Sequence, residues 1–373
     1  MDSRLLASLN FQAENTTDPL IWARTLCKAA AHFARHGMST EAFKAISIVR
    51  DHYGVNLDPE VASWLMLAEG VLHYFRANTI DAYDRFRRAY GLATALQTES
   101  ALPVCAAWMA LVEFHNGEYI RMSAHIEEAL SAAKADDHAT HARAALVLAD
   151  AYHLAGSYSL ARPWYEKARL RSADDGDNAT LSAMLYNVAA IRASNVRLDD
   201  SFGIDSSKEA HRAGMETASS RHYDHAIDSH GLDFLSLLLR GLTKTLSKSY
   251  GEALEIFESI DQTKLLAQMN APLFADMAWC FANIGEMEKS DAYLELAKLN
   301  IDAIIEFDDR AYVNSRISQT LALLHRQNES EPYEIAANFA LSKHRDFQKK
   351  LLSQLDAIRI DEAGRSFFNR LAK

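Results

Sequence analysis

Apolar residues recur along this chain at helical spacing, and small or apolar residues mark the same point of successive segments. Six of these positions are Ala42, Ala82, Met122, Ala161, Ala253 and Ser290. The steps between them are 40, 40, 39, 92 and 37 residues, and 92 is close to two periods plus a small insertion. A period of this size is typical of arrays of α-helical hairpins, in which each hairpin packs only on its neighbours. The pattern therefore predicts one extended all-α array over residues 1–373.

The clearest hairpin covers residues 144–168. Its first helix ends at Gly156, and a short turn at Ser157 and Tyr158 leads into the second helix. Small residues at Ala149 and Ala161 let the two helices approach closely. Aspartate, proline and glutamate at positions 58–60 predict a helix start in another repeat, with a capping carboxylate and proline in the first turn.

The order of residues in each hairpin resembles the tetratricopeptide repeat family. A small residue, an aromatic residue, glycine, alanine, an aromatic residue and alanine follow one another in most units, for example Gly70, His73, Ala77, Ala82, Phe86 and Ala89. The resemblance implies a right-handed superhelix, an α-solenoid, of about eight antiparallel helix hairpins. The spacing is nearer 40 than the family's usual 34 residues, and most units lack its proline. The long period resembles sensor domains of bacterial regulators.

Four parts of the array are distinguished by the regularity of the pattern. Residues 1–171 and 223–330 carry regular repeats, residues 172–222 a degenerate repeat or hinge, and residues 331–373 C-terminal capping helices. In the degenerate part we expect a helix over 179–197, an irregular segment over 198–205 and a helix near 206–219. Segment 198–219 is either a worn repeat or a hinge, since low local stability suits moving parts.

Composition limits the classes of function. Acidic residues exceed basic ones, 50 against 39, which argues against nonspecific nucleic-acid binding. The cysteines at 27, 105 and 280 lack the spacing of a disulfide framework or a zinc site. No apolar stretch is long enough to span a membrane and no signal core follows Met1, so we expect a cytoplasmic protein.

Catalytic chemistry has little support in the sequence. His222, His225 and His230 are weak candidates for metal ligands, since two of them lie one helical turn apart. No second ligand pair at a fixed spacing supports this site, so a histidine-rich polar junction between helices is the favoured interpretation. No phosphate-binding loop, dinucleotide fingerprint or nucleophile elbow is present. We therefore expect no enzyme activity and no cofactor.

The resemblance implies that the first helix of each hairpin lines a concave surface. Carried over position by position, this surface would include the residues Trp64, Leu67, Val71, Tyr74, Leu111, Phe114, Arg143, Asp150, His153 and Trp279. Two interpretations stay open. These residues form a groove for a peptide or partner helix, or they bury against one another in a tightly wound superhelix.

The leading hypothesis is a noncatalytic, regulatory or scaffolding module that binds a protein or peptide partner in this groove. The alternative is a regulatory sensor that binds a small signal and acts through a partner, and a metal-dependent enzyme is a remote third. Apolar residues near both ends of the sequence suggest docking on the array or homo-oligomerisation: Leu5, Leu6, Leu9 and Phe11, and Phe367, Phe368 and Leu371.

Overall fold

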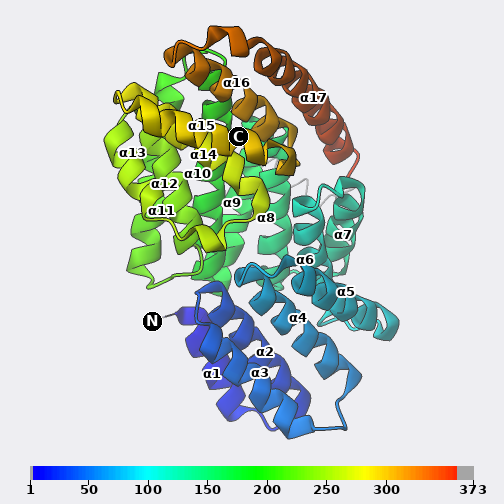
Figure 1. Ribbon diagram of the computed structural model, residues 1–373. Coiled ribbons are helices and arrows are strands. Elements are labelled where there is room, and N and C mark those ends of the chain that lie inside the picture. Colours follow the sequence, from blue (N-terminus) through cyan, green and yellow to red (C-terminus); the bar gives the residue numbers. More distant parts are fainter. Residues whose placement is uncertain (1–2, 359–373) are drawn as a thin grey trace. The chain divides into compact units, whose positions relative to one another are not determined.

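The structure, a computed structural model, describes residues 3–358. Throughout that range the regular elements are α-helices and short 3₁₀ turns, with no strand (Figure 1). This confirms the all-α prediction. No helix in the described range combines the length and apolarity needed to cross a bilayer.

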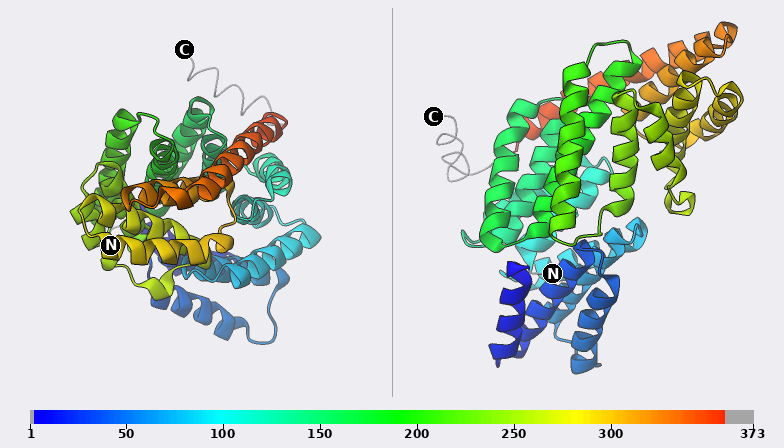
Figure 2. Two further views of the ribbon diagram at one scale, coloured as in Figure 1. Left: turned by 45° about the horizontal axis from the view of Figure 1, so that its top comes forward. Right: turned by 90° about the vertical axis from the view of Figure 1, so that its left-hand side faces the viewer.

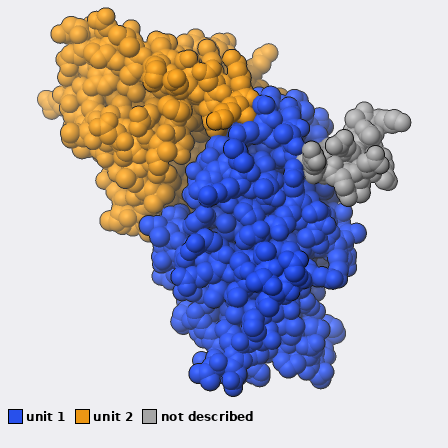
Figure 3. Space-filling model, turned by 90° about the vertical axis from the view of Figure 1, so that its right-hand side faces the viewer, with its two compact units in different colours: residues 1–184, 223–232, 351–373 blue, residues 185–222, 233–350 orange. Residues whose placement is uncertain are grey.

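The described residues divide into two compact units (Figure 3). Unit 1 contains residues 3–184, 223–232 and 351–358, and unit 2 contains residues 185–222 and 233–350. Each unit is built from consecutive antiparallel hairpins. The single continuous array expected from the repeats stays a prediction.

Unit 1 begins with one helix and continues with four hairpins (Figures 1 and 2). Helix α1 (Arg4–Asn15) packs on α2, and the hairpins pair α2 (Pro19–Arg35) with α3 (Ser39–Tyr53), α4 (Pro59–Phe75) with α5 (Thr79–Leu96), α6 (Leu102–His115) with α7 (Tyr119–Ala132), and α8 (His138–Leu154) with α9 (Tyr158–Asp175). The small or apolar positions that set the repeat period are fully buried in these hairpins: Ala42, Ala82, Met122 and Ala161. Close helix approach explains why large polar residues do not occur there.

Local sequence signals fix where these helices begin and end. The Asp58 carboxylate accepts hydrogen bonds from the backbone N–H groups of Glu60 and Val61 at the start of α4. Such a cap satisfies backbone donors that have no partner inside the helix. Gly156 follows α8 with a φ of +78°, a left-handed conformation that glycine adopts without strain. Both positions behave as the sequence predicts.

Helix α1 and the first hairpin of unit 1 also contact residues far along the chain. The Arg4 guanidinium donates to the backbone oxygen of Ala173, and the backbone N–H of His230 donates to the oxygen of His36 at 3.1 Å. Gly231 lies so close to the Arg35 carbonyl that a Cβ would not fit. Unit 1 is therefore held by contacts between hairpins that are not neighbours in sequence.

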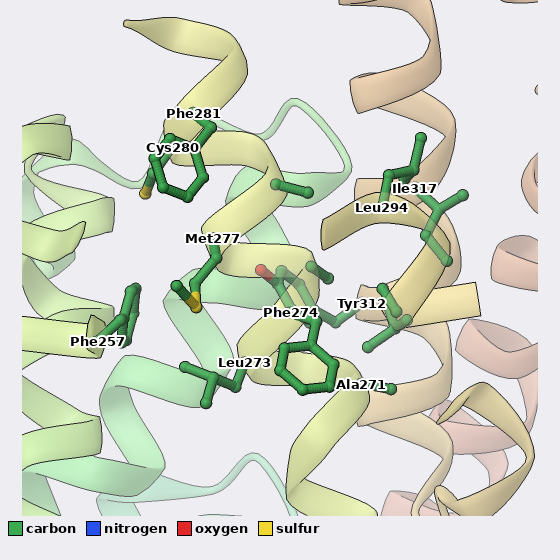
Figure 4. Close-up of a cluster of buried hydrophobic side chains, with 14 of the residues drawn as sticks. Phe257, Ala271, Leu273, Phe274, Met277, Cys280, Phe281, Leu294, Tyr312 and Ile317 are labelled. Atoms are coloured by element: carbon green, nitrogen blue, oxygen red, sulfur yellow. The ribbon is translucent and has the colours of Figure 1, made fainter. Parts of the chain in front are cut away.

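Unit 2 has a continuous apolar core (Figure 4). Its helices include α12 (Asp233–Leu246), α13 (Tyr250–Glu258), α14 (Ala267–Asn283), α15 (Met287–Asn300) and α16 (Phe307–Leu323). Helix α14 lies at the centre of this core: it contributes Met277 and Phe281 to the same cluster that contains Phe257 of α13 and Tyr312 of α16. The short 3₁₀ turns are η1 (Gln262–Lys264), η2 (Ile301–Ala303) and η3 (Gln327–Glu329).

The middle of the chain is more helical than the sequence predicts. Helix α10 (Asn178–Ser201) continues past residue 197, and α11 (Ser207–Ala226) follows after a short connection. The expectation of irregular structure over 198–205 is therefore wrong for its first four residues. Leu198 is buried in the core of unit 2, which stabilises this last helical turn despite its polar neighbours.

The last described helix is α17 (Glu331–Asp356), which begins at the start of the region predicted to form C-terminal capping helices. Leu351 and Leu355 near its end are buried. Phe367, Phe368 and Leu371, for which we expected docking or oligomerisation, lie outside the described residues.

Candidate functional site

The structure buries most of the residues predicted to line the groove. Nine of the ten lie in unit 1, on α4, α6 and α8. Seven of these nine are buried: Trp64, Leu67, Val71, Leu111, Arg143, Asp150 and His153. Tyr74 and Phe114 are half-buried. The first-helix face is therefore accessible at these two aromatic residues, and at the other seven it packs inside unit 1.

Trp64 shows how this packing is achieved. Its indole Nε1 lies 3.4 Å from the hydroxyl of Ser100, which in turn donates to Glu60 at 2.5 Å. The ammonium group of Lys28 on α2 lies 5.4 Å from the centre of the Trp64 ring. An ammonium group over an indole face is attracted by the ring quadrupole. Residues of three hairpins thus enclose this side chain.

The polar residues predicted on α8 belong to an internal network. The Tyr165 hydroxyl donates to Asp150 at 2.8 Å and lies 3.2 Å from Nδ1 of His153. The Arg143 guanidinium lies over the ring of Trp108, 4.2 Å from its centre. Burial, and next the charge of Arg35, lower the pKa of Arg143 to about 10. These groups are satisfied by their own chain, as buried polar groups normally are.

An ion pair joins α2 to the start of α10 across unit 1. Arg35 Nη1 lies 2.6 Å from Asp177 Oδ2, and both side chains are almost completely buried. Thr180 donates a further hydrogen bond to the same carboxylate at 2.7 Å. Burial alone would raise the pKa of Asp177, but Arg35 and Thr180 outweigh it and hold that pKa well below its usual range. The pair stabilises the approach of hairpins that are far apart in sequence.

In unit 2 the predicted groove residue Trp279 is half-buried under an arginine of the same chain. The Arg316 guanidinium lies 4.4 Å from the centre of the Trp279 ring. It also donates to Asp200 Oδ2 of α10 at 2.6 Å. The Trp279 side chain, which the sequence pattern assigned to ligand binding, is therefore in contact with an arginine of its own unit.

Several exposed apolar residues of unit 1 lie where its first helices end and its second helices begin. Ile80, Ile120 and Leu160 start α5, α7 and α9, and they are 83%, 73% and 44% exposed. Tyr158, at the start of α9, is also exposed, and its ring centre is 5.0 Å from that of His153. We call the following seven residues the turn edge: Tyr74, Ile80, Phe114, His115, Ile120, Tyr158 and Leu160.

Contacts along the turn edge connect successive hairpins. The Tyr74 hydroxyl, at the end of α4, lies 3.5 Å from ring nitrogens of His115, at the end of α6. The rings of Phe114 and His115 have centres 5.3 Å apart. The turn edge therefore presents an aromatic and aliphatic surface that also includes the imidazole ring of His115.

The model of one protein family, the tetratricopeptide repeat, matches residues 103–169. This range covers most of α6 to α9, which form the last two of the three hairpins that carry the turn edge. The protein contains tetratricopeptide-like repeats. The matched range and the all-helical architecture together confirm the resemblance drawn from the residue pattern. No curated protein matches the chain.

Tetratricopeptide-like repeats are generally noncatalytic modules for protein interaction. Among the described residues, no three His, Cys, Asp or Glu side chains are placed to hold a metal ion. His222, His225 and His230 are exposed, and a metal site at these residues stays a prediction.

Sequence reasoning missed the exposed aliphatic residues of the tetratricopeptide-like repeats. Ile80, Ile120 and Leu160 are spaced by exactly one 40-residue period, so a search for repeated apolar residues at exposed positions would have found them. Lys28 was missed as well. Only the contact with Trp64 distinguishes it from other surface lysines.

Two buried histidines, one in α2 and one directly after it, predict a loss of stability in acid. His32 and His36 are buried, and none of their ring nitrogens has a hydrogen-bond partner. Burial, and next the charge of Arg35, lower their pKa values to about 3 and about 4. A folded-state pKa below the unfolded value near 6.5 means that the stability is complete above pH 6.5 and falls as the pH decreases towards 4.

We therefore expect His32→Phe to flatten the decrease in unfolding free energy between pH 6.5 and pH 4, measured by urea denaturation. The exposed His222→Phe variant is the control and should keep the wild-type slope. An unchanged slope in His32→Phe would show that other groups cause the loss.

Proposed function

We propose that this protein is a noncatalytic module for protein interaction and that the turn edge is its binding surface in unit 1. The exposure of Ile80, Ile120 and Leu160 at successive repeats carries this proposal. Scattered exposed apolar residues are ordinary on a protein surface, but a repeated series next to half-buried aromatic residues is typical of an interaction site. Tyr74 and Phe114 are the predicted groove residues that remain accessible to a partner.

The turn edge has the chemistry of an interface centre. Aromatic side chains supply large contact areas at a small cost in conformational entropy, and the aliphatic residues beside them gain stability when water is removed. A helix or extended segment that presents apolar side chains fits such a surface.

A comparison of three variants tests this function. Ile120→Asp places a charge on the turn edge, Ile48→Asp makes the same change at an exposed position of α3, and Trp64→Ala removes a buried ring. Quantitative mass spectrometry after affinity capture is expected to show specific partners with wild type and Ile48→Asp and to lose them with Ile120→Asp. Equal capture by both isoleucine variants would contradict the proposal.

The third variant separates packing from binding. Trp64→Ala should lower the free energy of unfolding by about 3 kcal/mol or more, as for other buried aromatic residues. Phe114→Ala, at a half-buried position, should keep the cooperative fold while weakening capture. A stable Trp64→Ala protein would show that this ring does not support the core.

A regulatory sensor is the second candidate. The ion pair of Arg35 with Asp177 joins hairpins that are not neighbours, so its rupture would change the winding of unit 1. A signal that binds only one of the two windings would shift their populations. Small-angle scattering of Arg35→Gln should then show a larger radius of gyration than wild type, and an identical profile would argue against this candidate.

A further inference from the structure

The last turn of α10 is helical although its sequence is unfavourable for the end of a helix. It contains Asp199 and Asp200, and the helix dipole disfavours negative charge near a C-terminal end. No basic residue lies in this turn to offset these charges. Contacts from other elements of unit 2 must therefore hold the turn in its helical form. We call residues 197–202 the α10 end.

Helix α16 supplies most of these contacts. Arg316 Nη2 donates to Asp200 Oδ2 at 2.6 Å, and the arginine side chain is only 1% exposed. The backbone oxygen of Ser201 accepts hydrogen bonds from Ser315 Oγ at 2.5 Å and from Gln319 Nε2 at 2.8 Å. A carbonyl group at the end of a helix has no donor inside that helix, so α16 satisfies a group that α10 cannot satisfy itself.

A second arginine and two apolar residues complete the contact. The Arg197 guanidinium lies over the ring of Tyr312, 4.1 Å from its centre, and its Nη1 lies 3.8 Å from Asp276 Oδ2 of α14. Leu198 is buried in the apolar core of unit 2, and Phe202 packs against the same core. The α10 end is therefore bound through charged, apolar and backbone groups within six residues, as a short peptide ligand is bound.

The side chains that hold the α10 end lie on one face of a first helix, the kind of face that the repeat resemblance assigned to partners. On α16 they follow at helical spacing: Tyr312, Ser315, Arg316 and Gln319. Trp279 of α14 adjoins this face through its contact with the Arg316 guanidinium. Asp200 is 39% exposed and Trp279 is half-buried, so the contact is open to solvent at its edge.

We propose that this face of α16 is a binding site for an acidic segment of a partner protein, and that the α10 end occupies the site in the same molecule. Asp200 and the carbonyl group of Ser201 take the places of a carboxylate and a backbone oxygen of the partner. The occupant can be displaced, because a turn with little stability of its own opens before the rest of its unit. The partner's apparent affinity is then lowered by the fraction of molecules in which the site is occupied.

This inference goes beyond the proposed function, because the site belongs to unit 2 and does not involve the turn edge. It also gives a physical reason for the helical turn that the sequence does not predict. Positions where the local sequence disagrees with the structure are often functional.

Titration of the full chain with a fluorescent peptide of residues 196–204, blocked at both termini, tests the proposal. Wild type should bind the peptide weakly. Asp200→Lys should bind it about tenfold more tightly, because a lysine opposite Arg316 disfavours the occupied state. Asp199→Lys makes the same charge change one residue away from that ion pair and should bind like wild type. Equal binding by all three proteins would overturn the proposal.

A change in the peptide tests the recognition of its carboxylate. The peptide with Asp200→Asn should bind the Asp200→Lys protein about tenfold more weakly than the unchanged peptide does, since it lacks the charge that pairs with Arg316. Equal affinities for the two peptides would mean that α16 does not select an acidic segment, and this result also overturns the proposal.

Hydrogen exchange of the wild-type chain, followed by mass spectrometry, needs no substitution and decides the question even if Asp200→Lys is unfolded. Amides of the α10 end should exchange about tenfold or more faster than amides in the middle of α14 and α16, because the turn opens without unfolding of unit 2. If the three segments exchange at the same rate, the α10 end is a fixed part of the core and the proposal is wrong.

Discussion

Replacement of Gly70 by alanine is expected to destabilise unit 1 by about 1–3 kcal/mol, although alanine is the better helix former. A Cβ at position 70 would lie 2.6 Å from Cδ1 of Phe86, much closer than van der Waals contact. The Phe86 ring cannot move aside easily, because it is fully buried and stacked on Trp108 with ring centres 5.2 Å apart. Urea denaturation followed by circular dichroism measures the effect.

Gly91 provides a matched control in the partner helix. It lies on the exposed side of α5, and a Cβ there meets no atom within 4 Å. Gly91→Ala should therefore stabilise the protein by about 0.5–1 kcal/mol, since alanine restricts the unfolded chain more than glycine does. If both variants lose stability equally, close helix approach is not the reason for glycine at position 70.

Removal of one partner of the Arg35 and Asp177 ion pair should cost about 3–5 kcal/mol, because an unpaired charge is left in the interior. Asp177→Ala removes the carboxylate oxygen that lies 2.6 Å from Arg35 Nη1. The buried Arg35 guanidinium then has no carboxylate partner at that position. The double variant Arg35→Leu with Asp177→Leu removes both charges and should recover much of the loss. Thermal and urea unfolding of the three proteins measure these differences.

The pH dependence of this pair has a defined sign. The pKa of Asp177 is lower in the folded protein than in the unfolded chain, so the pair stabilises the fold above about pH 4 and the contribution disappears as the pH falls further. The Asp177→Ala variant should therefore lose less stability than wild type below pH 4. Parallel acid-unfolding curves for the two proteins would contradict this assignment.

The repeat spacing predicts the fold because small residues at helix crossings are a local requirement. Gly70 sits where two helices approach and a Cβ would not fit, and Ala82 in the partner helix is fully buried. The surfaces that these hairpins present are less predictable. Asp150 and His153 look like groove residues in the sequence, but the hydroxyl of Tyr165 satisfies them inside the unit.

The limits of prediction from the sequence have a physical cause. Whether a first-helix residue faces a partner or its own chain depends on how tightly the hairpins wind, and contacts between distant residues set that winding. Arg35 and Asp177 are separated by 142 residues, and no local pattern marks them as partners. The end of α10 is a similar case, because Leu198 is held by a core whose other members follow much later.

The contacts between the first hairpin and residues 173–231 also bear on how unit 1 folds. In an open repeat array each hairpin contacts only its neighbours, so the end repeats fray and folding can start at any repeat. Arg35 and His36 instead couple the first hairpin directly to residues 177 and 230. Loss of the first hairpin would thus weaken the far end as well, and amide hydrogens at both places would exchange through the same opening event. We expect unit 1 to unfold as a single cooperative body. When it folds, we expect a slow final step in which its two ends join.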